Sequence, residues 1–416
     1  MLAIAALSAR ALTEAARADG YDVLALDVFG DVDTRRAATT WLALAAGGAD
    51  DNTLRIHPAA LCAGLQQAAS QGAMGWIAGS GFEADLSLLQ AGAAVLPLIG
   101  NPAAVWRAVR DPVQFFGCLQ AAGLPCPAWQ GNAPADPTGW LVKDPGSSGG
   151  SAVQPLALWQ RSGLPLPASG YFQRLLPGQP VSLTFVANGK RALVLGANQQ
   201  QVQTMTGGLA GEAKGECEGE GDCRPFRFAG VIGPVALPAA ALATLQHALD
   251  LLVAQFQLRG LGSLDALLHG DQVHLLELNP RPPASLQLYP AVAGQRVVAA
   301  HVNACLHGQL PAAPWPGRAP QVRGLRVVHA PTRLHITAAL SARLANWPGA
   351  QDLPQPGTHL AAGDPLCSLQ ASANSLAAVH AVLGLAQTNL LRDLRAAITA
   401  LDCLHTPATV AESLPT

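Results

Sequence analysis

Residues 265–281 have the sequence DALLHGDQVHLLELNPR, and this stretch decides the fold. The alternation of apolar and polar residues predicts two antiparallel strands, 264–268 and 272–278, joined by a loop of three residues. This register would place Leu275 opposite Asp265. The stretch therefore predicts a hairpin that gathers polar side chains on one sheet face.

Three oxygen-bearing side chains should share one face of this hairpin: Asp265, Glu277 and Asn279. Mg²⁺ prefers octahedral oxygen ligands and completes its shell with substrate phosphates, so this set beside Arg281 indicates a magnesium–nucleotide site. The alternative is an ordinary hairpin with surface acids. It does not explain why Glu277 stands within a run of leucines, where an unpaired buried charge would cost several kcal/mol.

Composition limits the class of protein. The chain has 416 residues, of which 50% are hydrophobic, enough for about two or three domains with large cores. The charged fraction of 12% and the formal net charge of −2 give no electrostatic footprint for nucleic acid or a membrane surface. We therefore expect small-molecule partners, with a homodimer left open.

Targeting and cysteine signals favour the cytoplasm. Eight cysteines are scattered without a Cys-x-x-Cys pair, which argues against a zinc module or a disulfide scaffold. Cys217 and Cys223 share a glycine-rich loop and could form a labile bond, although free thiols are the default expectation. Residues 1–7 lack the basic region of a signal peptide, and no run of about 20 apolar residues predicts a membrane span. These features predict a soluble cytoplasmic protein.

The N-terminal segment predicts an open parallel sheet, because residues 3–7, 9–18 and 21–26 follow a strand–helix–strand pattern. The turn after the first strand, Ser8-Ala9-Arg10, lacks the Gly-x-Gly-x-x-Gly cradle for a pyrophosphate. This argues against a dinucleotide site, even though Asp27 ends the second strand.

A further strand at 74–78 leads into a turn of the kind that binds ligands in open α/β sheets. We predict that the following residues face a substrate: Ser8, Arg10, Gly79, Ser80, Gly81 and Glu83. A tight turn that needs positive φ would explain the two glycines equally well. Asp31 and Asp33 could likewise cap a helix instead of contacting a ligand.

A lysine precedes a glycine–serine loop. The only lysines are Lys143, Lys190 and Lys214, and Lys143 ends a predicted strand at 140–143. The loop at 146–151 has the sequence GSSGGS, which lets backbone amides approach phosphate oxygens closely. A flexible loop with a surface lysine is the alternative, and the acidic hairpin downstream weakens it.

The remaining segments complete the order of elements. We predict strands at 95–99, 171–175, 181–187, 191–196, 322–329 and 366–371, and helices at 103–122, 238–255, 293–305 and 374–400, the last interrupted at Gly384. Residues 200–224 form a long polar loop, and the proline-rich stretch 308–319 predicts a linker.

Lys143 with its glycine loop, the acidic hairpin and the run Glu277-Leu278-Asn279-Pro280-Arg281 together resemble the ATP-grasp superfamily of carboxylate–amine ligases. The resemblance covers most of the chain, and residues 352–357 and 363–367 are similar to the C-terminal β-domain of members such as biotin carboxylase. It implies an α/β fold of the ATP-grasp type. The expected units are an N-terminal open parallel sheet at 1–102, a two-lobed nucleotide domain at 103–310 and a small C-terminal β-rich domain at 318–416.

The resemblance also implies residue roles, with ATP and Mg²⁺ as cofactors. Asp265, Glu277 and Asn279 would hold Mg²⁺, and Arg281 would stabilise the acyl-phosphate transition state. Lys143 would contact phosphate and adenine and take part in catalysis. Two sets would bind the nucleotide: Gly146, Ser147, Ser148, Gly149, Gly150 and Ser151 over the phosphates, and Gln173, Arg174, Leu175 and Leu176 beside the adenine.

The chain departs from the family pattern at several positions. Pro112 stands where the family often has a lysine, which leaves Arg107 or Arg110 as substitutes. Pro180 stands near the place of a ribose-binding glutamate, and residues 173–174 replace paired acids. These changes concern nucleotide affinity and base preference rather than the metal site.

The resemblance implies an ATP-dependent ligase that forms an amide through an acyl phosphate, with glutamate as one reactant. More narrowly, residues 8–10, 27–33, 79–83 and 173–182 are similar to ATP-grasp proteins linked to tetrahydromethanopterin or methanofuran-type one-carbon carrier synthesis in methylotrophic bacteria. Two other functions stay open: a nucleotide-binding regulatory or scaffold protein with a decayed site, and a carboxylase that acts through carboxyphosphate.

Overall fold

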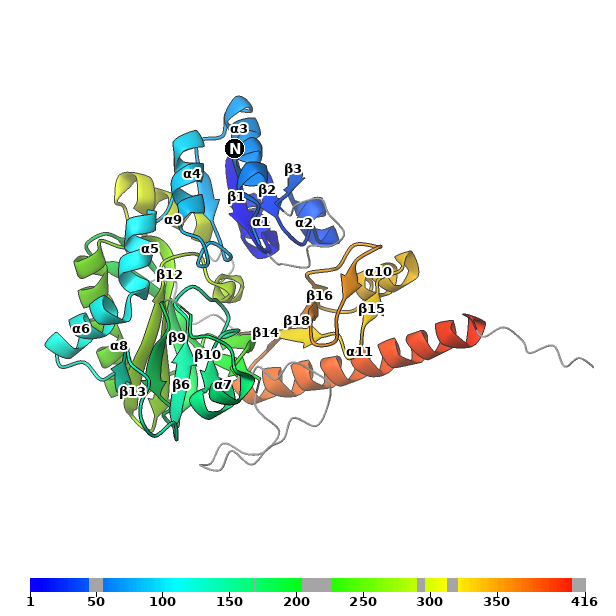
Figure 1. The fold of residues 1–416 in the computed structure, drawn as a ribbon. Helices are drawn as coiled ribbons and strands as arrows, with labels where there is room; N and C mark the ends of the chain where they lie inside the picture. Colours follow the sequence, from blue (N-terminus) through cyan, green and yellow to red (C-terminus); the bar gives the residue numbers. More distant parts are fainter. Residues whose placement is uncertain (45–54, 168, 204–225, 290–295, 313–320, 406–416) are drawn as a thin grey trace, which may run out of the picture.

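The computed structural model describes residues 1–44, 55–167, 169–203, 226–289, 296–312 and 321–405, with the backbone alone for 398–405. Figure 1 shows three groups of elements: the N-terminal group in blue, the central group in cyan to yellow, and the C-terminal group in orange and red. The long helix α11 (Leu376–His405) extends beyond the C-terminal group (Figure 1).

A parallel sheet of four strands, in the order β3-β2-β1-β4, forms the N-terminal group and confirms the predicted open sheet. Leu2 and Ile4 on β1 pack with α1 on one face, whereas Ala3 and Ala5 pack with α3 and α4 on the other. This two-sided burial explains the continuous apolar sequence of β1. The bounds are β1 (Leu2–Ala6), α1 (Arg10–Ala18), β2 (Val23–Asp27), α2 (Val32–Ala37), β3 (Thr40–Ala43), α3 (Pro58–Ser70), β4 (Trp76–Ala78) and α4 (Ser87–Val95).

Two predicted elements between residues 95 and 122 are wrong. Val95 ends α4, and Leu98 makes only an isolated bridge to Trp76, because Pro97 has no amide hydrogen to extend a ladder. The predicted helix 103–122 is two helices, α5 (Ala103–Arg110) and α6 (Pro112–Ala121). The junction follows from Asp111, whose side chain accepts from the Val113 amide and caps α6 with a proline at its first position.

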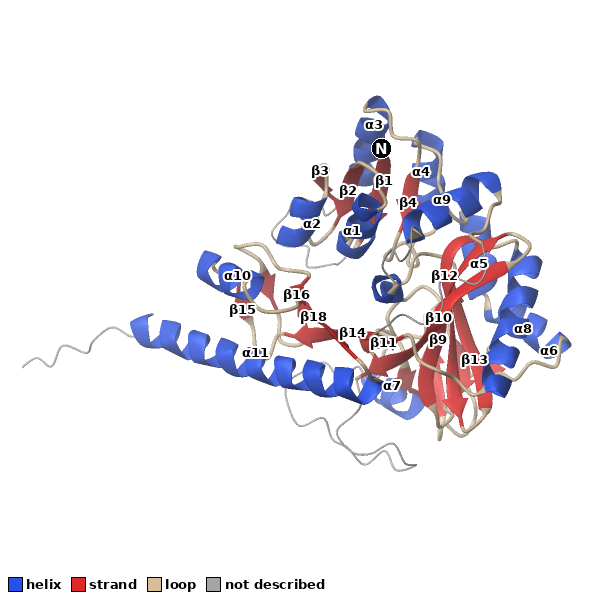
Figure 2. Ribbon diagram, turned by 180° about the vertical axis from the view of Figure 1, so that it is seen from behind, coloured by secondary structure: helices blue, strands red, loops and turns tan. Residues whose placement is uncertain are grey.

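The central group contains two antiparallel sheets that form opposite lobes. The small sheet has the order β5-β8-β6-β7 and carries the predicted strand 140–143. The large sheet begins β13-β12-β9-β10-β11, and α8 packs against it (Figure 2). The bounds are β5 (Trp129–Gln130), β6 (Trp140–Lys143), β7 (Gln154–Pro155), α7 (Leu156–Ser162), β8 (Tyr171–Arg174), β9 (Gln179–Asn188), β10 (Ala192–Val202), β11 (Phe228–Gly233), α8 (Ala239–Phe256), β12 (Arg259–His269), β13 (Gln272–Asn279), the 3₁₀ helix η1 (Ala284–Leu288) and α9 (Val297–His307).

Helix α8 is long and apolar enough to cross a membrane by length and composition alone. Leu245, Leu249 and Leu252 are fully buried in the core beneath the large sheet, which is how the central helix of a globular domain behaves. The helix therefore packs one face into this core, and its length and composition alone are weak evidence of a membrane span.

The large sheet continues into the C-terminal group, because β14 pairs with β11 and is followed by β18 and β16. The predicted strand 322–329 is β14. The predicted interruption of the last helix at Gly384 is wrong: α11 is continuous, and Val379, Leu383 and Leu390 bury one face of it. One glycine costs about 1 kcal/mol in a helix, which such packing outweighs. The bounds are β14 (Val322–His329), β15 (Leu334–His335), α10 (Ala338–Ala345), β16 (Ala350–Gln351), β17 (His359–Leu360) and β18 (Pro365–Ala373).

The described cysteines are free thiols, as the sequence predicted. Within the described residues the free thiols are Cys62, Cys118, Cys126, Cys305 and Cys367. Cys217 and Cys223, and residues 204–225 of the predicted polar loop, lie outside the described residues.

Candidate active site

The acidic hairpin of β12 and β13 forms the outer edge of the large sheet, but its register differs from the prediction. His269 pairs with Gln272, so the turn has two residues rather than three. A bulge follows Asp265, so this residue lies opposite Glu277 and not Leu275. The extra residue in β13 arises because a bulge sets two residues of one strand against one of its partner. The predicted strand pairing was therefore wrong, while both strands exist.

The bulge still brings the three predicted oxygen-bearing side chains together. The Asn279 amide nitrogen lies 3.2 Å from Asp265 Oδ2 and 3.4 Å from Glu277 Oε1. Glu277 is not buried among leucines, as the sequence suggested, because its side chain keeps 45% exposure and lines a cavity. Leu275 and Leu278 point into the core instead. The predicted common face of the hairpin is confirmed.

The two carboxyl groups have pKa values that are displaced in opposite directions. Burial, followed by the nearby Glu277 charge, raises the pKa of Asp265 to about 7. The cavity walls partly shield Glu277 from water and act on its pKa in the same sense, but Lys143 and Arg110 outweigh this effect and lower that pKa. Asp265 Oδ1 is buried and accepts no hydrogen bond from the described residues.

An orphaned carboxylate oxygen beside a second carboxylate and an amide fits a hard divalent cation such as Mg²⁺. In the described part of the chain, no group of three or more His, Cys, Asp or Glu side chains could hold a metal ion unaided. The set therefore suits Mg²⁺ that completes its shell with phosphate oxygens.

Lys143 reaches this set from the small sheet on the opposite lobe. Its Nζ lies 3.6 Å from Glu277 Oε2 and 5.9 Å from the centre of the Tyr171 ring. Burial alone would lower the pKa of Lys143, but the Tyr171 hydroxyl and the Glu277 carboxylate outweigh it and raise the pKa. A buried, charged lysine is thus aimed at the acidic hairpin.

The glycine–serine loop lies beside Lys143 and is held by Arg110. The Arg110 guanidinium donates to the carbonyl oxygens of Pro145 at 2.6 Å and of Ser147 at 2.5 Å. Gly150 has φ of 70°, and a Cβ there would lie 2.0 Å from the Phe226 carbonyl oxygen, so this position requires glycine. The loop residues that line the cavity are Ser147, Ser148, Gly149 and Gly150, whereas Gly146 and Ser151 do not.

Of the two arginines considered as substitutes for the family lysine, Arg110 lines the cavity and Arg107 is exposed outside it.

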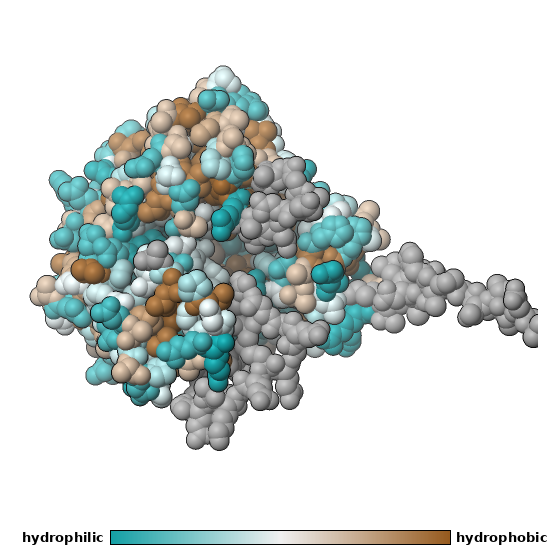
Figure 3. Space-filling view, viewed as in Figure 1, coloured by the Kyte–Doolittle hydropathy of each residue, from teal (hydrophilic) through white to brown (hydrophobic). Residues whose placement is uncertain are grey.

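The cavity has a volume of about 1650 Å³ and contains most of the predicted site residues. Gln173, Arg174, Leu175 and Leu176 line it at the small sheet. Gln173 is buried, and its Nε2 has no hydrogen-bond partner among the described residues. On the face seen in Figure 3, hydrophilic and hydrophobic residues are intermixed.

The N-terminal turn meets the hairpin through an ion pair. Arg281 Nε donates to Glu83 Oε1 at 2.6 Å, and the Gly81 amide donates to Glu83 Oε2 at 2.7 Å. Glu83 is fully engaged and, like Gly81, does not line the cavity, whereas Ser8, Gly79 and Ser80 do. The pair connects the two predicted groups of substrate and catalytic residues.

Arg10 lines the cavity but is almost fully buried and satisfied by the protein. Its nitrogens donate to Asp352 at 2.7 Å, Glu14 at 2.8 Å and Gln287 at 2.7 Å. That Arg10 faces a substrate stays a prediction.

Sequence reasoning missed several cavity residues. Gln200 and Ser263 both act on Asp265 and partly counter the rise in its pKa, and Asp352 reaches the cavity from the C-terminal group. Gln200 lies near the end of β10, but the sequence predicted that this strand ends at residue 196. A correct prediction of the strand's length would have been needed to place Gln200 on the sheet beside Asp265.

The chain has the ATP-grasp fold. This fold is seen in its parallel N-terminal sheet, its two antiparallel lobes and the lysine that faces an acidic hairpin between them. Residues 109–285 match the family model described as the ATP-grasp domain. No curated protein sequence matches the chain.

Solved structures share this fold over nearly the whole chain. An L-amino acid ligase from Bacillus licheniformis is 15% identical, with a TM-score of 0.64, covering 93% of this chain and 96% of its own. N5-carboxyaminoimidazole ribonucleotide synthetase from Thermus thermophilus is 16% identical, with a TM-score of 0.60 and coverage of 91% and 95%. The biotin carboxylase domain of 2-oxoglutarate carboxylase from Hydrogenobacter thermophilus, solved with MgADP and bicarbonate, is 10% identical, with a TM-score of 0.63 and coverage of 89% and 86%.

Proposed function

We propose that the protein is an ATP-dependent carboxylate–amine ligase that forms an amide through an acyl phosphate. The observation that carries this proposal is the single cavity lined by Lys143, Asp265, Glu277, Asn279 and Arg281. Such chemistry needs charge neutralisation and positioning rather than a covalent nucleophile, and these side chains supply both. Small-molecule substrates follow from this proposal, and a homodimer remains compatible with it.

The roles divide between the two lobes. Asp265, Glu277 and Asn279 would hold Mg²⁺, which when bound neutralises phosphate charge. Lys143 and the glycine–serine loop would bind the phosphates, and residues 173–176 would line the adenine side. Arg281, oriented by Glu83, would stabilise charge on the transferred phosphoryl group.

The products of ATP cleavage test this proposal. The expected products are ADP and phosphate, with one oxygen of a labelled substrate carboxylate recovered in the phosphate. Candidate carboxylates and amines are first screened for the thermal shift that they produce with MgATP. Those that raise the Tm are then used as substrates. Release of AMP and pyrophosphate would reject the acyl-phosphate route.

A narrower hypothesis concerns the pathway. We propose glutamate as one reactant and an intermediate of a tetrahydromethanopterin or methanofuran-type one-carbon carrier as the other, on the motifs at residues 8–10 and 79–83. Mass spectrometry of carriers from a deletion strain tests this. A full set of carriers with normal glutamate content would reject the pathway while leaving the ligase reaction untouched.

Carboxylation through carboxyphosphate is the second candidate, since the fold extends over biotin carboxylase domains including the C-terminal group. It predicts ATP hydrolysis that depends on bicarbonate and needs no organic acid. A regulatory protein with a decayed site is the third, and it predicts nucleotide binding without any substrate-dependent ADP release.

A further inference from the structure

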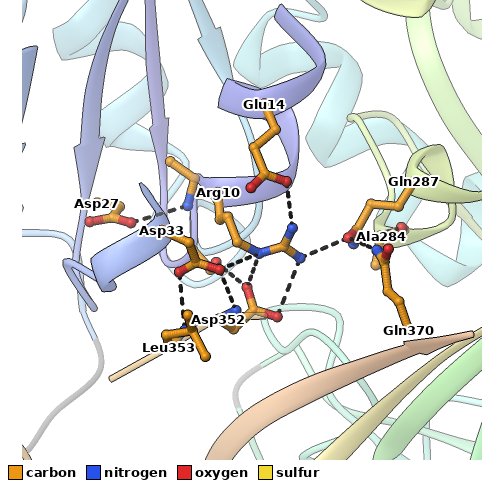
Figure 4. Close-up of polar contacts among 11 residues, drawn as sticks. Arg10, Glu14, Asp27, Asp33, Ala284, Gln287, Asp352, Leu353 and Gln370 are labelled. Atoms are coloured by element: carbon orange, nitrogen blue, oxygen red, sulfur yellow. Dashed lines mark hydrogen bonds and ion pairs between the residues drawn. The ribbon is translucent and has the colours of Figure 1, made fainter. Parts of the chain in front are cut away.

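The cavity has a second, acidic end where the N-terminal and C-terminal groups meet. Figure 4 shows Arg10 of α1 surrounded by Glu14, Asp33 and Asp352. The loop before α2 adds Asp31, which lines the same cavity as the predicted metal set. One guanidinium therefore faces four carboxyl groups.

Most of these groups are already satisfied. Asp352 and Glu14 accept from Arg10, and Asp33 accepts from the backbone amides of Asp352 and Leu353 at 2.8 and 3.0 Å. Asp27, at the end of β2, accepts from the Trp41 indole and from two backbone amides. The arrangement fixes the positions of these side chains and leaves an excess of negative charge.

Asp31 is the exception. It is only 7% exposed and stands at the N-cap position just before α2, yet its side chain accepts no hydrogen bond from the helix. No hydrogen bond or ion pair to its carboxyl group occurs among the described residues, although the group borders the cavity. A buried carboxylate without a partner is costly, so the fold holds this group available for a cationic ligand.

We propose that Asp31 binds the ammonium group of the amine substrate and accepts a proton from it. This inference rests on the proposed ligase function and adds the substrate class to it. A divalent metal is a poorer occupant, because no group of three or more His, Cys, Asp or Glu among the described residues suits one.

The surroundings also restrict the rest of the amine. Arg10 is engaged by protein groups, and Arg35 stacks 3.7 Å over the Trp41 ring while it donates to the Gly30 carbonyl. A carboxylate next to the amine nitrogen would therefore face Asp352 at the cavity wall, and neither of these two arginines would be available to pair with it. The site favours an amine with no carboxylate on the adjacent carbon, so glutamate as the proposed reactant would supply the carboxylate and not the amine. Phe29 offers the carbon chain of the amine an apolar contact at the cavity wall.

Amide formation consumes the acyl phosphate and the ammonium group and yields the amide, hydrogen phosphate and one proton. Asp31 takes one proton from R–NH₃⁺, and the nitrogen lone pair attacks the carbonyl carbon of the acyl phosphate. The C–N bond forms as the C–O bond to phosphorus breaks, and phosphate leaves with the electron pair. The nitrogen then loses its second proton. One of the two protons passes to the departing phosphate, which leaves as hydrogen phosphate, and the other is released to solvent, so that Asp31 returns to its starting state.

The charged groups around Asp31 make this step dependent on pH. They are Arg10 on α1, Asp27 on β2, Asp33 on α2, Asp352 after β16 and Cys367 on β18. Burial and then Asp352, Asp33 and Asp27 raise the pKa of Asp31 to about 8, against a smaller opposite effect of Arg10. Ammonium binding should therefore strengthen as pH rises toward 8 and level off above it.

Thermal shift of the full chain with n-butylammonium chloride tests the subsite, with n-butyrate and n-butanol as charge controls at constant ionic strength. At about pH 8.5, above the pKa of Asp31, the ammonium probe alone should raise the Tm. Asp31→Asn should weaken its binding by about tenfold or more, the size expected for loss of a charged hydrogen bond, while Asp31→Glu should retain part of it. Asp85→Asn, an exposed acid near the N-terminal turn, is the matched control.

An equal response of Asp31→Asn and the parent chain to n-butylammonium would overturn the subsite. So would an equal shift with n-butyrate, or a pH-independent affinity. Failure of the ligase proposal is distinguishable, because the products of ATP cleavage would then be wrong while the Asp31-dependent ammonium binding persisted.

Discussion

At the residue scale, Glu277 is the most exposed of the three oxygen-bearing side chains and the one paired with Lys143. Glu277→Gln keeps its volume and removes one negative charge from the predicted metal set. We expect about tenfold or more weaker binding of MgADP, because the lost charge interacts directly with the cation. Binding of ADP in the presence of EDTA should change little.

Titration calorimetry with and without Mg²⁺ measures this difference. The control is Asp271→Asn, which alters an exposed acid at the turn of the same hairpin. If Glu277→Gln and Asp271→Asn bound MgADP equally well, Glu277 would not be a metal ligand.

Glu83 gives a second prediction at this scale, since it acts through Arg281 rather than on substrate. Glu83→Gln removes the charge that holds the guanidinium at 2.6 Å and leaves a hydrogen-bonding amide. We expect kcat to fall by about tenfold while KM for ATP stays nearly constant, because Arg281 would still be present but less fixed. Asp85→Asn should leave both constants unchanged, and a rise in KM for ATP alone would contradict a positioning role.

At the scale of elements, Arg110 at the end of α5 holds the glycine–serine loop through two carbonyl oxygens. Arg110→Ala should loosen this loop and weaken ADP binding by about tenfold, given the usual strength of charged hydrogen bonds. Arg107→Ala removes an equal charge one turn earlier without touching the cavity. Nucleotide affinities of the two variants, compared by calorimetry, check the assignment, which equal losses would disprove.

The elements show what the sequence could and could not predict. Strands 140–143 and 322–329 were predicted to the residue, because apolar runs end at clear polar or glycine boundaries. The bulge after Asp265 was not predicted, because it arises where β12 pairs with β9 on one side and β13 on the other, and a local pattern does not show both partners. Long-range pairs are equally invisible: Arg281 and Glu83 are 198 positions apart, and no local pattern marks either as the partner of the other.

For the whole molecule, Arg10 connects all three groups of elements, since it donates to Glu14, to Gln287 of η1 and to Asp352. Lysine keeps the charge and has three donors, but they share one nitrogen and cannot reproduce the planar fork whose three separate nitrogens reach these three partners. Arg10→Lys should therefore destabilise the protein by about 2 kcal/mol or more and lower its Tm by several degrees. Calorimetric melts against Arg17→Lys, an arginine on the same helix with a half-exposed side chain, test this, and an unchanged Tm would show that the junction adds no stability.

Asp31 links this junction to the pH dependence of stability. Its folded pKa of about 8 lies far above the ordinary value of 3.8, so the folded chain binds a proton more tightly than the unfolded chain. The contribution of Asp31 to stability is therefore fully present below about pH 4 and is lost as pH rises to about 8.

Asp31→Asn removes the titration. The variant should match the parent near pH 4 and exceed its Tm increasingly up to pH 8, by an order of a few kcal/mol in unfolding free energy. Melts at several pH values measure the gap, and a difference that does not grow with pH would mean that Asp31 is not held as a buried, unpaired acid. A gain in stability together with loss of ammonium binding is the combination expected of a group that the fold keeps for its ligand.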